Sequence, residues 1–494
     1  MTILPSRTRW LALIVLCMGS LMIVLDATIV NVALPSIRAQ LHFSSTSLAW
    51  VVNGYLLTFG GFLLLGGRLG DLFGHRRLFI SGIVLFTVAS LACGLSGSRG
   101  LLVAARAVQG FGGAVVSAVS LSLMMSLFVE PAERAKAMGV FGFVMAGGGI
   151  LGVLAGGVIT DLLSWHWIFL VNVPIGIAVC PISLRLLPAH REAGGSARLD
   201  VAGAVLVTSA LMLAVYAIVG GNAAGWTSAQ TLGLLAAALA LLCAFALNES
   251  RVSAPLMPLA IFKLRNLATA NAVSALWAAA LFAWFFLSAL YMQLVLSYSP
   301  LQVGLAFLPA DLIMGIFSLG LSARVVMRVG VRRPLAIGMA LAALGLLLFA
   351  RAPVHGSFLA DILPSMVLLG IGDGMAFNPL LLAAMDDVAP SESGLASGVL
   401  NTSFMMGGAL GLAILASLAA SHTSSLLGSG AGHAAALAGG YRLAFLTGGL
   451  IAALAAAIGG SMLRALPAPP PDDAARQEVL PAVQPEEAEV SATG

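Results

Sequence analysis

Long apolar runs separated by short polar stretches occupy almost the whole chain. A helix needs roughly 20 apolar residues to cross a bilayer, and fourteen runs approach or exceed that length. We expect helices near residues 11–34, 48–69, 78–97, 101–128, 137–160, 166–187, 200–220, 229–248, 267–292, 301–323, 334–351, 358–382, 395–418 and 441–463. The pattern therefore predicts an all-α polytopic membrane protein with fourteen transmembrane helices.

The composition supports this class. Hydrophobic residues make up 60% of the 494 residues and charged residues only 9%, which is too few to cover the surface of a water-soluble protein. In a membrane protein the net charge of +4 reports the orientation in the membrane. It does not indicate nucleic-acid binding, so we expect no nucleic-acid partner. The sequence has no nucleotide-binding loop, metal-ligand spacing or nucleophile motif, so we expect neither an enzyme nor a cofactor.

The basic residues predict the orientation. Nineteen Lys and Arg residues fall on the side of the amino terminus and four on the opposite side. Under the positive-inside rule both termini are cytoplasmic, in a cell membrane that the chain crosses many times. Residues 1–10 form a short cytoplasmic start, and the Pro-, Ala- and acid-rich tail 464–494 is predicted to be disordered.

A glycine-rich polar segment, 67–77, predicts a tight cytoplasmic loop between the second and third helices. In this loop we assign the gating of the transport path to Gly67, Gly70, Asp71, Gly74, Arg76 and Arg77. A degenerate copy occurs at 324–333, and aligning Gly74 with Gly330 gives an offset of 256 residues. The chain is thus predicted to contain a duplication.

A second repeat extends the duplication. Residues 148–152 recur as 407–411, at an offset of 259 residues. We therefore predict two six-helix halves, 11–187 and 267–463. Two inserted helices, 200–248, lie between them, flanked by cytoplasmic loops 188–199 and 249–266. Repeated halves around a site at the membrane midplane are typical of alternating-access transporters.

Four segments carry a family resemblance. Residues 67–77 resemble the loop signature of the major facilitator superfamily, and 25–35 are similar to the first-helix signature of its fourteen-helix drug:proton antiporter family. Residues 106–110 and 165–174 resemble further runs of that family. The resemblance implies a proton-driven monomeric transporter whose fifth helix seals the two halves on the outside. We assign Gly148, Gly152, Gly156 and Gly157 to that seal; a purely packing role is the alternative.

Two ionisable residues in the first half are predicted to pair. A charged side chain at the bilayer centre costs about 2.5–3.5 kcal/mol. Asp26 lies 16 residues beyond Trp10, or about 24 Å along a helix, and Arg106 lies just inside the outer end of the fourth helix. At this similar depth they could form an ion pair that couples proton binding to helix movement. A permanent structural ion pair is the alternative.

The second half contains two acids near the midplane. Asp311 lies about 15 Å into its helix, and Asp373 lies within the glycine-rich segment 370–374. Without a matching base they would suit a cationic substrate. The alternative for each is a protonated carboxyl that donates one hydrogen bond between helices. The residues assigned to substrate binding are Asp311, Asp373, Trp277, Trp284, Phe307, Phe377, Asn378 and Gln109.

Trp277 and Trp284 lie on one helix face, seven residues apart. Their rings could stack on flat lipophilic ligands or hold cations; packing or lipid contact is the alternative. The sequence as a whole favours a proton-coupled exporter of hydrophobic, cationic or amphipathic small molecules. A facilitator or importer of a polar metabolite on the same fold remains open, and a membrane sensor without transport is a second alternative.

Overall fold

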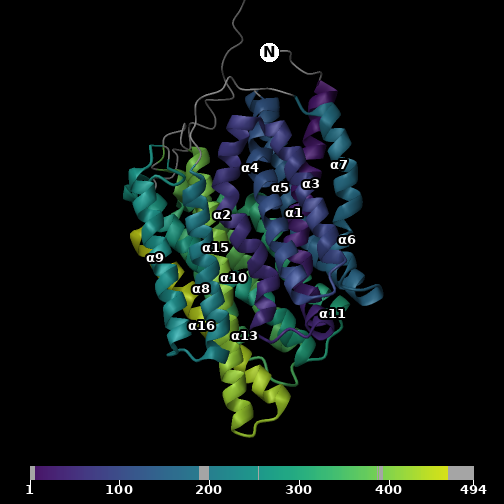
Figure 1. The fold of residues 1–494 in the computed structure, drawn as a ribbon, viewed down its shortest axis with the longest axis vertical. Coiled ribbons are helices and arrows are strands. Elements are labelled where there is room, and N and C mark those ends of the chain that lie inside the picture. Colours follow the sequence, from purple (N-terminus) through teal and green to yellow (C-terminus); the bar gives the residue numbers. More distant parts are fainter. Residues whose placement is uncertain are drawn as a thin grey trace, which may run out of the picture.

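The protein is a bundle of long α-helices in the computed structural model (Figure 1). The structure describes residues 6–128, 130–188, 200–253, 255–386, 388 and 393–464. In the first half, helices α1 to α5 cover Ser6–Leu41, Trp50–Phe73, His75–Gly94, Arg99–Leu127 and Pro131–Leu162. The short α6 (Trp167–Leu170) and α7 (Asn172–Leu186) together form the sixth span.

The insert and the second half follow. The insert consists of α8 (Val201–Ala224) and α9 (Ala229–Arg251). The second half contains α10 (Arg265–Leu294), α11 (Pro300–Ile316), α12 (Ser322–Val329), α13 (Arg332–Phe349), α14 (Leu363–Asp386), α15 (Ser393–Gly428) and α16 (His433–Met462). Short helical turns occupy Ser47–Ala49, Leu259–Lys263, Phe317–Leu321 and Phe358–Ile362.

Thirteen spans in the described residues are long and apolar enough to cross a membrane. The shorter α11 accounts for the remaining predicted span, so the all-α polytopic fold is confirmed. Helix α1 runs from one end of the bundle to the other. Its first residue marks the Ser6 end, at the top of Figure 1, and its last residue marks the Leu41 end. The predicted tail beyond Arg464 and most of the loop 188–199 lie outside the described residues.

The two halves pack in the same way at equivalent glycines. A Cβ on Gly152 of α5 would lie 2.9 Å from the carbonyl oxygen of Leu25 on α1. Its counterpart 259 residues later, Gly411 of α15, would place a Cβ 2.2 Å from the Cα of Ala279 on α10. Since side chains cannot fit at either position, each pair of helices approaches backbone to backbone, as the internal repeat predicts.

The insert contacts both halves. In its first third, α8 faces α2, where a Cβ on Gly61 would lie 1.9 Å from the hydroxyl of Thr208. Toward the Leu41 end, Asn222 of α8 donates to the carbonyl oxygen of Ser417 on α15, at 2.8 Å. The insert therefore spans the seam between α2 and α15.

The predicted loop 67–77 is wrong in extent. Helix α2 continues to Phe73 and α3 begins at His75, so the turn is a single residue, Gly74, with φ 91°. The repeated turn also has a left-handed glycine, Gly330, with φ 77°. Only a residue without a side chain reverses the chain this tightly at low cost, so the polar residues before Gly74 extend the helix instead of forming a loop.

Two other predicted boundaries are also wrong. The helix expected over 301–323 is interrupted after Ile316 by a π-helical turn, in which Gly320 leaves helical backbone angles. The connection expected over 419–440 is mostly helical and forms the yellow-green hairpin that projects at the bottom of Figure 1. Its Ala-rich sequence favours helix despite its low hydropathy, and Gly430, with φ 91°, lies in the turn.

Candidate functional site

The predicted pair between Asp26 and Arg106 forms in the structure. A guanidinium nitrogen of Arg106, Nη1, lies 2.5 Å from Oδ2 of Asp26, and neither side chain is more than 1% exposed. The second carboxylate oxygen, Oδ1, accepts from the amide of Gln109 at 2.7 Å and from that of Asn172 at 3.1 Å. Both oxygens of this buried carboxylate therefore have donors, as burial of a charge requires.

Arg106 has further partners that hold its guanidinium in place. Its Nε donates to the carbonyl oxygen of Val51 at 2.9 Å, and Nη1 donates to Gln109 at 2.7 Å. The guanidinium carbon lies 4.4 Å from the ring centroid of Tyr55 and 5.6 Å from that of Phe169, within the range of cation–π attraction. The positive charge would thus keep several contacts if the carboxylate were protonated.

All of these partners belong to the first half, on α1, α2, α4, α6 and α7. The amide of Gln109 also donates to the hydroxyl of Ser90 on α3, at 2.8 Å. The structure therefore places Gln109, assigned from sequence to substrate binding, beside the ion pair. In this conformation the network lies within one half and is shielded from solvent.

Asp311 lies in a different environment. It is 4% exposed on α11, and its Oδ2 has no hydrogen-bond partner among the described residues. One helical turn away, the ring of Phe307 lies 5.6 Å from that of Trp284 on α10, centroid to centroid. The indole Nε1 of Trp284 is likewise buried without a described partner. An acceptor and a donor thus lie near the same buried ring, and both are unused.

Asp373 is 2% exposed on α14 and has one clear partner. The indole Nε1 of Trp277 donates to its Oδ1 at 2.6 Å. The Trp277 ring in turn lies 6.1 Å from Phe377 and 5.4 Å from Phe404. Phe377 is 49% exposed, so one edge of this aromatic cluster faces outward. Asn378 follows Phe377 on the same helix.

The residues assigned to gating separate into two groups. The face of α5 that carries Gly148, Gly152 and Gly156 packs on α1, within the first half. Gly157 instead faces the second half, where a Cβ would lie 2.9 Å from the carbonyl oxygen of Pro300. The contact between halves at the Leu41 end therefore depends on Gly157, together with Gly304 across the seam.

The turn residues lie at the Ser6 end. Gly67, Gly70 and Asp71 lie in the last turns of α2. Arg76, two residues after Gly74, donates to the carbonyl oxygen of Leu184 on α7, and Arg77 is exposed. Both arginines therefore lie at the start of α3.

Sequence reasoning missed two polar residues of the first half. Asn172, a ligand of Asp26, lies in a segment used only for family resemblance. Asn53 is fully buried on α2, and neither polar atom of its side chain has a described partner. Asn53 is the one amide side chain of α2, and Asn172 is the one amide side chain of α7. Polar residues are rare in membrane spans and mark functional positions, so each amide could have been noticed from the sequence.

Comparison with known proteins settles the family. The sequence pattern of the Major Facilitator Superfamily matches residues 16–412. The chain belongs to the major facilitator superfamily. The prediction made from residues 67–77 and the repeat is thereby confirmed.

Relatives in this superfamily cover most of the chain. Puromycin resistance protein pur8 of Streptomyces alboniger is 39% identical over 425 residues, covering 86% of this chain and 84% of the relative. Cephamycin export protein CmcT of Amycolatopsis lactamdurans is 40% identical over 422 residues, covering 85% and 87%. The tetracenomycin C resistance and export protein of Streptomyces glaucescens is 34% identical over 421 residues, covering 84% and 77%.

Solved structures support the fold. The inward open conformation of the xylose transporter XylE from E. coli aligns with a TM-score of 0.62 at 15% identity, covering 93% of this chain and 97% of that one. An auto-inhibited peptide transporter of the POT family aligns with a TM-score of 0.64 at 17% identity, covering 92% and 96%. At this identity the likeness concerns the fold alone.

Proposed function

We propose that this major facilitator exports hydrophobic, cationic or amphipathic small molecules in exchange for protons, by alternating access. Both termini are cytoplasmic in this proposal, so the Leu41 end faces outward. Relatives named as antibiotic resistance and export proteins support the direction of transport. The distribution of charge supports the exchange with protons.

The observation on which the proposal depends is the unpaired carboxyl of Asp311. In the first half, the charge of Asp26 is balanced by Arg106. In the second half, no described basic side chain pairs with Asp311 or Asp373. Since a buried ionised acid costs about 2.5–3.5 kcal/mol, each acid favours a bound proton or a bound cation, but not both at once.

This exclusion gives an exchange cycle. A proton entering from outside neutralises the acid and displaces the cationic substrate outward. When the halves rock and the site faces the cytoplasm, release of the proton restores the charge that attracts the next substrate. We propose that no cofactor is needed. A one-for-one exchange of a proton for a monovalent cation moves no net charge, so the pH difference drives it, at about 1.4 kcal/mol for each tenfold ratio of proton concentrations.

Asp26 has a separate place in this cycle. Protonation would remove its negative charge, while Arg106 keeps its contacts with Val51, Gln109 and Tyr55. The pair of Asp26 and Arg106 then changes from a net charge of zero to a net positive charge. We propose that this change alters the packing of α1 against α4 and so couples proton binding to the rocking motion.

Dye efflux in inverted vesicles under an imposed pH gradient tests the proposal. We expect Asp26→Asn and Asp311→Asn to reduce proton-driven transport at least about tenfold, a barrier increase of about 1.4 kcal/mol. Asp373→Asn should weaken transport of cations more than that of neutral dyes. A protonophore should abolish transport by the wild type.

Asp161→Asn is the matched control, because Asp161 is an exposed acid outside the bundle interior. Normal pumping by all three interior variants would contradict the carboxyl assignments. Transport that persists after collapse of the proton gradient would contradict proton coupling itself.

A further inference from the structure

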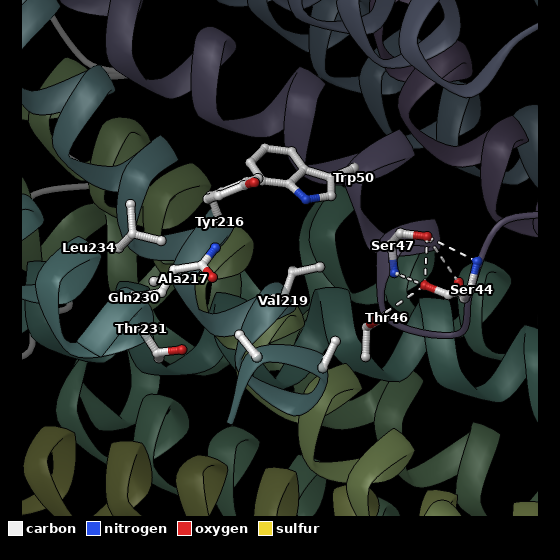
Figure 2. A pocket seen from close by; sticks show the side chains of 13 residues that line it. Ser44, Thr46, Ser47, Trp50, Tyr216, Ala217, Val219, Gln230, Thr231 and Leu234 are labelled. Atoms are coloured by element: carbon white, nitrogen blue, oxygen red, sulfur yellow. Dashed lines mark hydrogen bonds between the residues drawn. The ribbon is translucent and has the colours of Figure 1, made fainter. Parts of the chain in front are cut away.

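A pocket of about 360 Å³ lies at the Leu41 end, between the insert and the first half (Figure 2). Its volume falls within the range of small-molecule sites, about 300–1,000 Å³. None of the residues discussed above for proton or substrate binding lines it. The lining residues are Ser44, Thr46, Ser47, Trp50, Tyr216, Ala217, Val219, Gly220, Ala223, Ala224, Gln230, Thr231 and Leu234.

One wall of the pocket belongs to the first half, and the other belongs to the insert, which contacts both halves. One wall is the segment 44–50, which joins α1 to α2. The opposite wall is α8, which is held on α15 of the second half: Asn222 donates to the hydroxyl of Ser417 at 3.0 Å, and that hydroxyl donates to the carbonyl oxygen of Ile218 at 3.2 Å. A ligand in the pocket would therefore bridge the first half and the part of α8 that is held on α15.

The lining chemistry suits an uncharged polyol. Hydroxyl groups and the amide of Gln230 can both donate and accept hydrogen bonds, and Trp50 and Tyr216 add aromatic faces with polar tips. None of the described residues that line the pocket is charged. A sugar ring presents hydroxyl groups at its rim and apolar C–H faces, and so matches this combination better than a phosphate or an ammonium group.

The position of the pocket points to a lipid. Trp50 begins α2, and Trp226, which is 46% exposed, lies just beyond the end of α8. Aromatic residues of this kind mark the membrane–water boundary. Beside the pocket, α9 exposes Leu232 and Leu239, at 53% and 62%. A headgroup in the pocket could thus leave its acyl chains along the apolar surface of α9.

We propose that this pocket binds the uncharged sugar headgroup of a membrane glycolipid, at the boundary of the leaflet that adjoins the Leu41 end. In the orientation proposed above this is the outer leaflet. The bound lipid holds the segment 44–50 against α8 and so links the first half to the part of α8 that is held on α15, beside the α2–α15 seam. The site is independent of the direction of transport and of proton coupling.

Native mass spectrometry of the purified full chain with added diglucosyl-diacylglycerol tests the site. No atom lies within 4 Å of a Cβ built on Gly220, so Gly220→Leu fills the pocket without disturbing the helix. We expect this variant to lose affinity for the glycolipid by about tenfold or more. Gly233→Leu is the matched control, because Gly233 is also a glycine of the insert with nothing within 4 Å but lies outside the lining.

Headgroup chemistry is tested with Gln230→Ala and with two comparison lipids. We expect Gln230→Ala to weaken the glycolipid severalfold, and phosphatidylglycerol and phosphatidylethanolamine to bind weakly and without sensitivity to Gly220→Leu. Unchanged glycolipid affinity in Gly220→Leu would overturn the site. Phosphatidylglycerol binding that is equally tight and equally sensitive would overturn the choice of ligand, as would displacement of the glycolipid by an exported dye.

Discussion

Trp277 and Trp284 lie seven residues apart on α10, yet only one of the two indoles has an acceptor. The Trp277 Nε1 donates to Asp373 at 2.6 Å, whereas the Trp284 Nε1 is buried without a described partner. A hydrogen bond contributes about 0.5–1.5 kcal/mol to a neutral group and about 1.5–3 kcal/mol to a charged one, and an unsatisfied buried donor instead costs free energy. The two residues should therefore respond differently to the same substitution.

We predict that Trp277→Phe lowers the free energy of unfolding by about 1–3 kcal/mol, since Asp373 loses its donor. Trp284→Phe should be neutral or slightly stabilising, because it removes an unused donor and keeps a ring near Phe307. Thermal unfolding of the purified protein in detergent measures both. Equal losses of stability would mean that ring packing, and not the hydrogen bond, governs Trp277.

At the scale of one element, the face of α5 on which a glycine lies decides whether that glycine is needed for packing. A Cβ on Gly156 would lie 2.7 Å from the carbonyl oxygen of Ile29, whereas one on Gly149 meets nothing within 4 Å. A backbone oxygen cannot turn aside as a flexible side chain can. The close approach of α1 and α5 therefore depends on Gly156 and not on Gly149.

We predict that Gly156→Ala destabilises the protein by about 1–3 kcal/mol, as overpacked interiors do. Gly149→Ala should leave stability unchanged or raise it slightly, because alanine favours helix. The yield and the unfolding temperature of the two purified variants provide the measurement. A harmless Gly156→Ala would show that α1 moves away easily.

The start of α8 gives a prediction about pH. Burial tends to raise the pKa of Asp200, but bonds from the Gly203 amide at 2.7 Å and the Asn248 side chain at 2.8 Å outweigh it, so this pKa lies below its ordinary value. An acid whose folded-state pKa is depressed stabilises the fold above its unfolded pKa of about 3.9. That contribution is lost as the pH falls through the folded-state pKa.

Asp200→Ala should therefore cost about 0.5–2 kcal/mol at pH 7, the usual effect of losing a helix cap. The difference from the wild type should shrink when the pH is lowered below about 3.9. Parallel unfolding measurements in detergent at the two pH values check this. A difference that does not change with pH would mean that the charge of Asp200 has no part in capping.

At the scale of the whole molecule, the two halves meet closely at the Leu41 end. Gly157 of the first half approaches the carbonyl oxygen of Pro300, and Gln293 of α10 donates to the carbonyl oxygen of Val32 on α1 at 2.8 Å. Alternating access requires such contacts to break when the site opens to this side. A side chain at Gly157 should therefore favour the opened state.

We predict that Gly157→Leu lengthens the distance between spin labels on Leu163 and Leu305, two exposed residues on opposite halves, in a background without cysteine. Double electron–electron resonance measures the distance. Gly149→Leu, on the same helix but without contacts near its Cβ, is the control. An unchanged distribution in Gly157→Leu would show that this contact does not restrain the seam.

The sequence by itself determined the membrane class and predicted the two repeated halves and the insert, because each depends on the order and length of apolar runs. It also indicated the pairing of Asp26 with Arg106, since the distance of each from a helix end fixes its depth. Depth does not fix how a helix is rotated or which helix lies beside it.

Rotation and neighbours were decided only by the tertiary structure. Gly148 and Gly157 share a helix, yet one packs within its half and the other against the opposite half. Gln109 lies beside Asp26, and Asp311 has an unpaired oxygen that no count along the chain predicts. Helix rotation and contacts between distant segments depend on the packing of all the helices together, so these features follow from the fold and not from any single segment.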